Sequence, residues 1–232
     1  MSSSVTVVEI RRYPVKSMAG ESLTEVEVDA RGLVGDRWYA VVDGDGKLSS
    51  GKSSRRFRRR DAVFDFGSRT TDRGVEVTGR GGAWPAGDPA LDAALSDAMG
   101  DPVRVLPEAE TPHFDDTALS LVGTASLDWC REHLGVDADP RRLRPNLLVG
   151  TTEPFVEESW AGEVQVGGVV LRTVGPTERC RMIDIAQQGL PREEGQWLRA
   201  LTRTRERNLG IYLDVVTPGV VRAGDAVVPS GR

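Results

Sequence analysis

The chain has 232 residues, of which 39% are hydrophobic and 28% are charged, and its formal net charge is −5. Its acidity argues against a general nucleic-acid binder, and two cysteines with two histidines are too few for a conventional Cys/His zinc site. The sequence contains neither an apolar run of about 18 residues nor the apolar core of a signal peptide, so we expect no membrane association and a cytoplasmic protein with reduced thiols.

Short strands are predicted in the N-terminal half, because apolar and polar residues alternate there between glycine, aspartate and proline turns. The predicted strands cover residues 4–13, 23–30, 38–43, 62–66, 74–79 and 102–107. One helix is predicted at 88–100, where Asp88 provides the N-cap, Pro89 suits the first turn and Gly100 ends the helix.

The segment 107–117 is acidic and contains proline, and we place a domain boundary there. Beyond it the sequence predicts helices at 124–135 and 191–206, a hairpin at 163–175 turning at Gly167 and Gly168, and strands within 210–229. Many short strands and few helices predict an α+β fold, predominantly β, of the barrel or sandwich type. The predicted domains are 1–106 and 107–232.

The two cysteines differ in their surroundings. Cys130 lies on the apolar face of the predicted helix 124–135, which favours a small buried hydrophobic residue. Cys180 follows a turn and stands between Arg179 and Arg181, and neighbouring arginines favour the thiolate. Three interpretations remain open for it at this point: an inert structural residue, a nucleophile with a base distant in sequence, and a soft metal ligand.

Cationic and amide side chains are predicted at the edges of three strands. Lys16 and Ser17 follow a proline, Arg37 precedes the strand 38–43, and Arg144 and Asn146 precede another strand. A phosphate or another anionic group suits such donors, since arginine binds it in a bidentate manner. The alternative interpretation for each is ordinary surface charge.

A run of five arginines surrounds Phe57 between Arg55 and Arg60. Basic residues with an aromatic ring are typical of nucleic-acid binding. The net acidity instead favours a solvated strand edge, where charge discourages edge pairing. A third interpretation is that the run borders an anionic ligand site or an acidic electron-donor protein.

Several motifs together resemble the MOSC-domain proteins, which are named for the C-terminal domain of molybdenum cofactor sulfurase. The likeness is to the branch with an additional N-terminal β-barrel, which includes the mitochondrial amidoxime-reducing component and its bacterial relatives. It covers nearly the whole chain and implies a MOSC-type β-barrel, a smaller N-terminal β-barrel-like domain and a few helices. The motifs are YPVKS, GLVGDRWYAVVD, DDTALSLVGTASLDWC, RRLRPNLLV, FVEESWAGEVQVGG, RC at 179–180 and PGVVRAGDAVV.

The resemblance implies a molybdenum–molybdopterin cofactor and the residues that hold it. Cys180 is the implied molybdenum ligand and a catalytic residue. Asp115 and Asp116 resemble a loop near the family's pocket, and we hypothesise that they deliver protons. The implied cofactor-binding residues are Lys16, Ser17, Arg37, Thr124, Ser126, Arg144, Asn146 and Arg179. Pyridoxal phosphate binding is a further property associated with the wider family.

The resemblance also implies an oxidoreductase that reduces N-hydroxylated or N-oxygenated small molecules. Because the chain has no cysteine cluster for an iron–sulfur centre, we expect electrons from a separate donor protein, ferredoxin-like or cytochrome b5-like with a reductase. The alternative is a non-catalytic carrier of molybdopterin or sulfur, with a persulfide on Cys180. Neither nucleic acid nor a membrane is expected as a partner.

Overall fold

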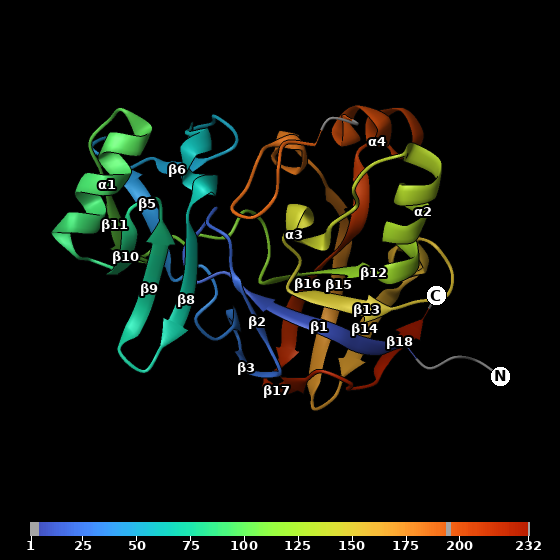
Figure 1. The fold of residues 1–232 in the computed structure, drawn as a ribbon. Coiled ribbons are helices and arrows are strands. Elements are labelled where there is room, and N and C mark those ends of the chain that lie inside the picture. Colours follow the sequence, from blue (N-terminus) through green and yellow to red (C-terminus); the bar gives the residue numbers. More distant parts are fainter. Residues whose placement is uncertain (1–4, 194–195, 232) are drawn as a thin grey trace.

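A computed structural model describes residues 5–193 and 196–231, and its largest element is a curled sheet of eight strands (Figure 1). Strands β12 and β13 run parallel, while the other neighbours in this main sheet are antiparallel. In spatial order the strands are β18 (Val227–Gly231), β14 (Ala161–Val166), β15 (Val169–Glu178), β16 (Asn208–Thr217), β12 (Leu119–Gly123), β13 (Leu147–Gly150), β1 (Thr6–Arg12) and β2 (Glu21–Leu23).

A small sheet of three strands closes over the apolar face of the main sheet. Its order is β17 (Gly219–Arg222), β3 (Glu25–Asp29) and β4 (Gly32–Leu33). In β3 the buried Val26 and Val28 alternate with the exposed Glu25 and Glu27, as expected for a strand with one face on a core. Both valines belong to one apolar cluster with Leu121 and other residues of the main sheet.

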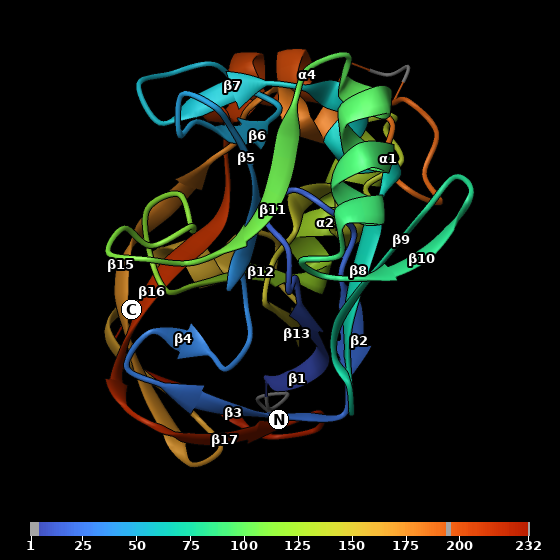
Figure 2. The same cartoon turned by 90° about the vertical axis from the view of Figure 1, so that its left-hand side faces the viewer.

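The N-terminal unit consists of two further sheets and one helix. One sheet has the order β11 (Val103–Pro107), β5 (Tyr39–Asp43), β6 (Leu48–Ser50) and β7 (Phe57–Arg59), and the other β10 (Gly82–Pro85), β9 (Gly74–Gly79) and β8 (Gly67–Thr71). Figure 2 shows helix α1 (Pro89–Met99) standing beside β11, with which it packs. Asp88 caps α1 and Gly100 ends it in the left-handed conformation at φ 66°, which confirms the predicted helix.

Three helices lie on the other side of the main sheet, around a third apolar cluster (Figure 1). They are α2 (Thr124–Leu134), α3 (Pro140–Leu143) and α4 (Trp197–Arg205). Cys130 of α2 and Trp197 of α4 are fully buried in this cluster. The expectation that Cys130 acts as a buried hydrophobic residue is therefore confirmed.

The predominantly β architecture is as predicted, and the hairpin at 163–175 forms with Val166 opposite Val169. The predicted strand at 62–66 is wrong, because Asp61–Asp65 form a 3₁₀ helix. The main-chain N–H of Val63 donates to the carbonyl of Arg60 and that of Phe66 to the carbonyl of Val63, which is the bonding pattern of a 3₁₀ turn, and the turn buries both Val63 and Phe64.

The predicted helix 191–206 is shorter than expected. Gln196 has a left-handed φ of 54° and α4 begins at Trp197, so Pro191–Glu193 precede the helix, and residues 194–195 lie outside the described part. Residue 4, where the first predicted strand begins, also lies outside it. Over 5–193 and 196–231, no helix is both long and apolar enough to cross a membrane.

The boundary at 106/107 stays a prediction. Strands from both sides of it share sheets, since β1 pairs with β13 and β3 pairs with β17. The segment 107–117 connects β11 of the N-terminal unit to the main sheet, and it passes along the cavity described next.

Candidate functional site

A cavity of about 330 Å³ lies where the N-terminal unit meets the main sheet. Its walls combine β6, the segment 107–117, and the ends of β15 and β16. The fold therefore gathers side chains that are far apart in the sequence. Nine residues of the predicted site line this cavity, namely Lys16, Ser17, Arg37, Asp115, Asp116, Arg144, Asn146, Arg179 and Cys180.

Four residues that line the cavity have a left-handed backbone. Ser17, Arg37, Arg144 and Arg207 have φ angles of 70°, 54°, 57° and 70°. For non-glycine residues this conformation costs about 1–3 kcal/mol and persists only where surrounding contacts fix it, which is frequent at binding sites. At Ser17 the hydroxyl donates to the carbonyl of Ser49 at 3.1 Å.

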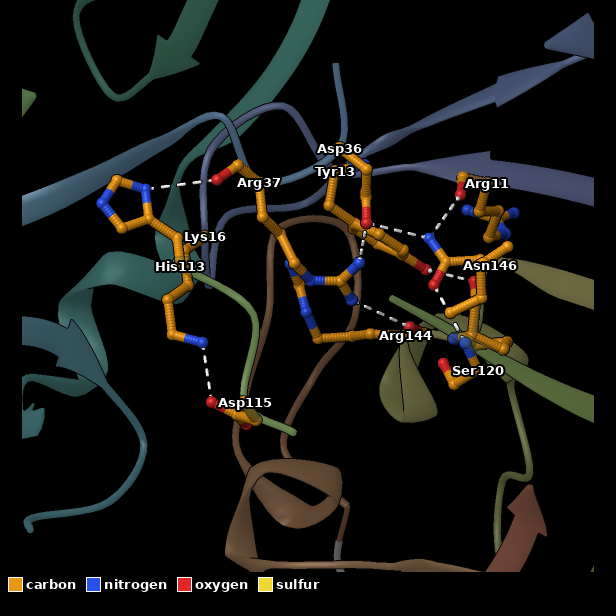
Figure 3. A network of polar contacts seen from close by, with 12 residues as sticks. Arg11, Tyr13, Lys16, Asp36, Arg37, His113, Asp115, Ser120, Arg144 and Asn146 are labelled. Carbon is orange, nitrogen blue, oxygen red and sulfur yellow. Dashed lines mark hydrogen bonds and ion pairs between the residues drawn. The ribbon is translucent and has the colours of Figure 1, made fainter. Parts of the chain in front are cut away.

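A buried polar network holds the cationic segments in place (Figure 3). The carboxylate of Asp36 accepts hydrogen bonds from the main-chain N–H of Tyr13 at 2.7 Å and from Nδ2 of Asn146 at 3.0 Å, and it pairs with Arg37. Oδ1 of Asn146 accepts the main-chain N–H of Ser120 at 3.1 Å. Four of the predicted motifs are thus tied together, and Asn146 acts here as a link between them.

Arg37 and Arg144 both stack on the ring of Tyr13 and so lie close to each other (Figure 3). Their guanidinium carbons are 4.9 Å and 4.3 Å from the ring centroid. Burial, assisted by the charge of Arg37, lowers the pKa of Arg144 to about 10. Within the described residues, the buried Nη2 of Arg144 has no hydrogen-bond partner, so a bound anion would relieve both the charge and the missing bond.

Lys16 is only 5% exposed, and its Nζ donates to Oδ1 of Asp115 at 2.7 Å (Figure 3). Burial lowers the pKa of Lys16 to about 8, although Asp115 opposes this shift. Burial would raise the pKa of Asp115, but the charges of Lys16 and Lys52 outweigh it and hold that pKa well below its usual range. Asp115 is therefore a carboxylate that neutralises two cations of the cavity.

Cys180 is half-buried at the end of β15 and lines the cavity. Both neighbouring guanidinium groups have other hydrogen-bond partners. Arg179 is buried and donates to main-chain carbonyls of α3 and β16 at 2.9 Å and 2.8 Å, and Arg181 forms a bidentate ion pair with Asp61 at 2.6 Å and 2.8 Å. The two arginines thereby fix the backbone on both sides of Cys180.

Two predicted site residues, Thr124 and Ser126, do not line the cavity. At the start of α2, Oε1 of the fully buried Glu157 accepts the N–H of Gly123 at 3.0 Å and the hydroxyl of Ser126 at 2.7 Å. The hydroxyl of Thr124 pairs with the main chain of Thr151. An internal carboxylate thus already satisfies this helix N-terminus.

The donor set fits a cofactor that brings most of its own metal ligands. Among residues 5–193 and 196–231, no group of three or more His, Cys, Asp or Glu side chains is placed to hold a metal ion. A single thiol beside several cations matches a metal complex that carries its own sulfur ligands and an anionic group. Two buried polar atoms of cavity residues, Nη2 of Arg144 and the hydroxyl of Thr177, have no hydrogen-bond partner among the described residues, which is consistent with a polar ligand.

Several lining residues were not predicted from the sequence, among them Lys52, Thr177, Arg207 and Tyr212. Tyr212 lies on β16, and burial raises its pKa to about 12, so its hydroxyl stays protonated. Lys52 adjoins the arginine run, which was the only signal for it in the sequence. Tyr212 gives no local signal, since it is one more aromatic residue in an alternating strand.

Comparison with protein families gives two matches in chain order. The MOSC N-terminal beta barrel domain matches residues 4–82, and the MOSC domain matches residues 99–228. The solved structure of YuaD from Bacillus subtilis aligns with a TM-score of 0.55 over 97% of this chain and 94% of that chain. At 15% identity, this likeness is one of fold alone.

Curated relatives carry the same two names that the motifs suggested. Human mitochondrial amidoxime-reducing component 1 is 22% identical over 286 residues, which cover 98% of this chain and 83% of that protein. Molybdenum cofactor sulfurase from Danio rerio is 22% identical over 271 residues, and the match covers 91% of this chain but only 32% of the sulfurase. The MOSC domain matches more than half of the length of this chain, and the chain therefore belongs to the MOSC-domain family.

Proposed function

We propose that the cavity binds a molybdenum–molybdopterin cofactor and that the protein reduces N-hydroxylated or N-oxygenated small molecules. The observation that carries this proposal is the half-buried thiol of Cys180 in the same cavity as Lys16, Arg37 and Arg144. The MOSC-domain family is associated with this cofactor, and one relative, matched over 83% of its own length, is an amidoxime-reducing component. The chain spans about a third of the sulfurase, so a sulfurase activity of the whole protein is not transferred.

In this proposal the thiolate of Cys180 is the protein's ligand to molybdenum. Lys16, Arg37 and Arg144 bind the pterin phosphate, because their charges converge in one cavity and arginine forms bidentate hydrogen bonds to phosphate. Ser17, which lines the same cavity and has a left-handed backbone, is assigned to the same phosphate in this proposal. The cofactor, when bound, would supply two-electron redox chemistry.

The chain's own groups supply orientation and protons. Reduction of an N-hydroxy compound to the amine takes up two electrons and two protons and releases water. In this proposal Asp116 relays protons from solvent to the substrate, because it lines the cavity and forms no ion pair with a described residue, whereas Asp115 is engaged by Lys16 and Lys52. The protonated hydroxyl of Tyr212 is available to orient the substrate by a hydrogen bond.

Electrons come, in this proposal, from a separate ferredoxin-like or cytochrome b5-like protein in the cytoplasm. The chain has two cysteines, and Cys130 is buried in the core, so its own thiols do not suffice for an iron–sulfur cluster.

The test is metal and pterin analysis of protein purified from a host that makes the cofactor. We expect molybdenum and pterin in equimolar amounts in the wild type, and loss of molybdenum and of N-reductase turnover in Cys180→Ser. The matched control is Cys130→Ala, which removes the other thiol and should retain molybdenum if circular dichroism shows an intact fold. Wild-type protein free of molybdenum and pterin would refute the proposal.

The carrier function is the second candidate, and the accessible single thiol of Cys180 favours it. A persulfide on Cys180, seen as an added sulfur atom by mass spectrometry of the intact protein, together with absence of reductase turnover would select this function instead.

A further inference from the structure

The segment 107–117 is fixed against the N-terminal unit where it passes the cavity. Arg31 forms an ion pair with Glu108, whose carboxylate also accepts the main-chain N–H of His113 at 2.7 Å. Nδ1 of His113 lies 3.2 Å from the carbonyl oxygen of Arg37 (Figure 3). The position of Asp115, two residues further on, is therefore set by several contacts rather than by its own ion pair alone.

The arginine run between Arg55 and Arg60 also helps to hold the segment 107–117 against the N-terminal unit. Arg58, Arg59 and Arg60 form ion pairs with aspartates of the N-terminal unit, which neutralise them. Arg56 instead turns toward the segment 107–117. Its guanidinium donates to the main-chain carbonyls of Pro112, Phe114 and Asp115 at 2.5 Å, 3.3 Å and 3.5 Å.

Three cations of this region share one aromatic ring. Nζ of Lys16, Nζ of Lys52 and the guanidinium carbon of Arg56 lie 4.8 Å, 4.9 Å and 5.2 Å from the ring centroid of Phe57. The carboxylate of Asp115 stands between the two lysines, 2.7 Å from one Nζ and 3.3 Å from the other. It occupies the place where an anion attracted by these cations would lie.

We propose that Asp115 is an internal counter-ion of the subsite formed by Lys16 and Lys52, and that anionic ligands bind there by displacing its carboxylate. Arg56 is the positioning residue that holds Asp115 against the lysines. This inference deepens the proposed function and rests on it only in requiring that the cavity bind an anionic group.

The arrangement has a consequence for selectivity. A buried ammonium group without a partner is costly, so the carboxylate stabilises the ligand-free cavity. A ligand must offer a stronger interaction than one carboxylate in order to replace it. Dianions such as a phosphate monoester meet this requirement, whereas singly charged carboxylates do not.

The first test measures the affinity for inorganic phosphate by isothermal titration calorimetry. Asp115→Asn removes the competing charge but keeps the shape of the side chain, so we expect phosphate to bind about tenfold more tightly. Asp116→Asn is the matched control, because Asp116 lines the same cavity without an ion pair to a described residue; we expect a clearly smaller gain. Unchanged or weaker phosphate binding by Asp115→Asn would overturn the inference.

The second test addresses Arg56 by comparison with Arg55, which is exposed in the same loop and makes no polar contact with the described residues. Arg55→Gln reports the general effect of losing one surface charge on phosphate affinity. Arg56→Gln should bind phosphate more tightly than Arg55→Gln, since Asp115 is then less firmly held. In the Asp115→Asn background this difference should vanish, and its persistence would show that Arg56 does not act through Asp115.

A crystal structure with phosphate provides a direct readout even if a variant folds poorly. We expect Asp115 to have left hydrogen-bond distance of Lys16 when phosphate is bound, and phosphate bound beside an intact ion pair would contradict the exchange. The counter-ion proposal and the cofactor assignment can be confirmed or refuted independently of each other. Protein that lacks molybdenum and pterin but still shows the Asp115→Asn gain would refute the proposed function and support the counter-ion.

Discussion

At Lys16, burial and ion pairing act on one ammonium group in opposite directions. Burial disfavours the charged form and lowers the pKa to about 8, while Asp115 supports the charge. The ammonium group is therefore charged below pH 8 and loses its proton as the pH rises through that value, instead of near the usual 10.5. We therefore expect anion binding in the cavity to weaken over the same pH range in which Lys16 loses its charge.

We predict that the affinity for sulfate falls as the pH rises between about 7 and 9, approaching a tenfold loss per pH unit at the upper end. Sulfate is chosen because its own charge is constant over this range. Lys16→Arg keeps the charge and should bind sulfate independently of pH, and Lys16→Gln should bind weakly throughout. The measurement is a calorimetric titration at several pH values, and a wild-type affinity that does not change would contradict the assignment.

The site residues that could be predicted from the sequence are those whose residue type and loop position together suggest anion binding. Lys16, Arg37 and Arg144 combine a cation with a loop position beside a strand, and the cavity contains all three. Thr124 and Ser126 were predicted by resemblance, but in the structure the hydroxyl of Ser126 donates to Glu157 and that of Thr124 pairs with the main chain of Thr151. Nothing in the local sequence indicates that a carboxylate some thirty residues away reaches this helix start.

Among the elements, β16 depends on one glycine. Gly210 has a φ of 79°, and a Cβ there would lie 2.4 Å from the carbonyl oxygen of Leu121 in β12 and 3.2 Å from Nη2 of Arg179. Both the left-handed backbone and the close approach of the two strands therefore require glycine.

We predict that Gly210→Ala lowers the free energy of unfolding by about 2 kcal/mol or more, because β12 and β16 must separate. Urea denaturation measures the loss. Gly44→Ala is the control, since a Cβ at Gly44 meets nothing within 4 Å; its stability should stay within about 0.5 kcal/mol of the wild type. Equal stability of the two variants would show that the strands adapt without cost.

For some elements the local sequence pattern is sufficient to predict the secondary structure, and for others it is not. Helix α1 has its cap, its first-turn proline and its terminal glycine within thirteen residues of sequence, and it forms as predicted at 88–100. The 3₁₀ helix Asp61–Asp65 is different, because its apolar residues satisfy a strand pattern as well. Packing of Val63 and Phe64 into the core of the N-terminal unit decides that case.

At the scale of the whole molecule, the N-terminal residues complete the sheets of the C-terminal part. Strand β1 lies between β13 and β2, and β3 pairs with β17. Val7, Ile10 and Val28 belong to the same apolar cluster as Leu147 and residues of β14 to β16. Without these strands, β13 and β17 would each lose a partner and the cluster would open to water.

We therefore predict that a fragment of residues 107–232 does not fold by itself, despite the predicted boundary at 106/107. Circular dichroism should show no cooperative thermal transition for this fragment. Addition of a 1–106 fragment should restore the transition by supplying β1 and β3. A cooperative transition of the isolated 107–232 fragment would instead establish it as an independent domain.

The predominantly β fold, the capped helix 88–100, the hairpin at 163–175, the MOSC family and most of the cations of the cavity could be predicted from the amino-acid sequence. The helix, the hairpin and the cations follow from residue type and from periodicity over a few neighbouring positions, whereas the family was inferred from the resemblance of several motifs in chain order. The ion pair between Asp115 and Lys16, which lies 99 positions away, and the one between Arg181 and Asp61 of the other unit are seen only in the folded chain. Such contacts depend on how distant segments pack together, and the alternation of apolar and polar residues along the chain does not indicate which segments pack against each other.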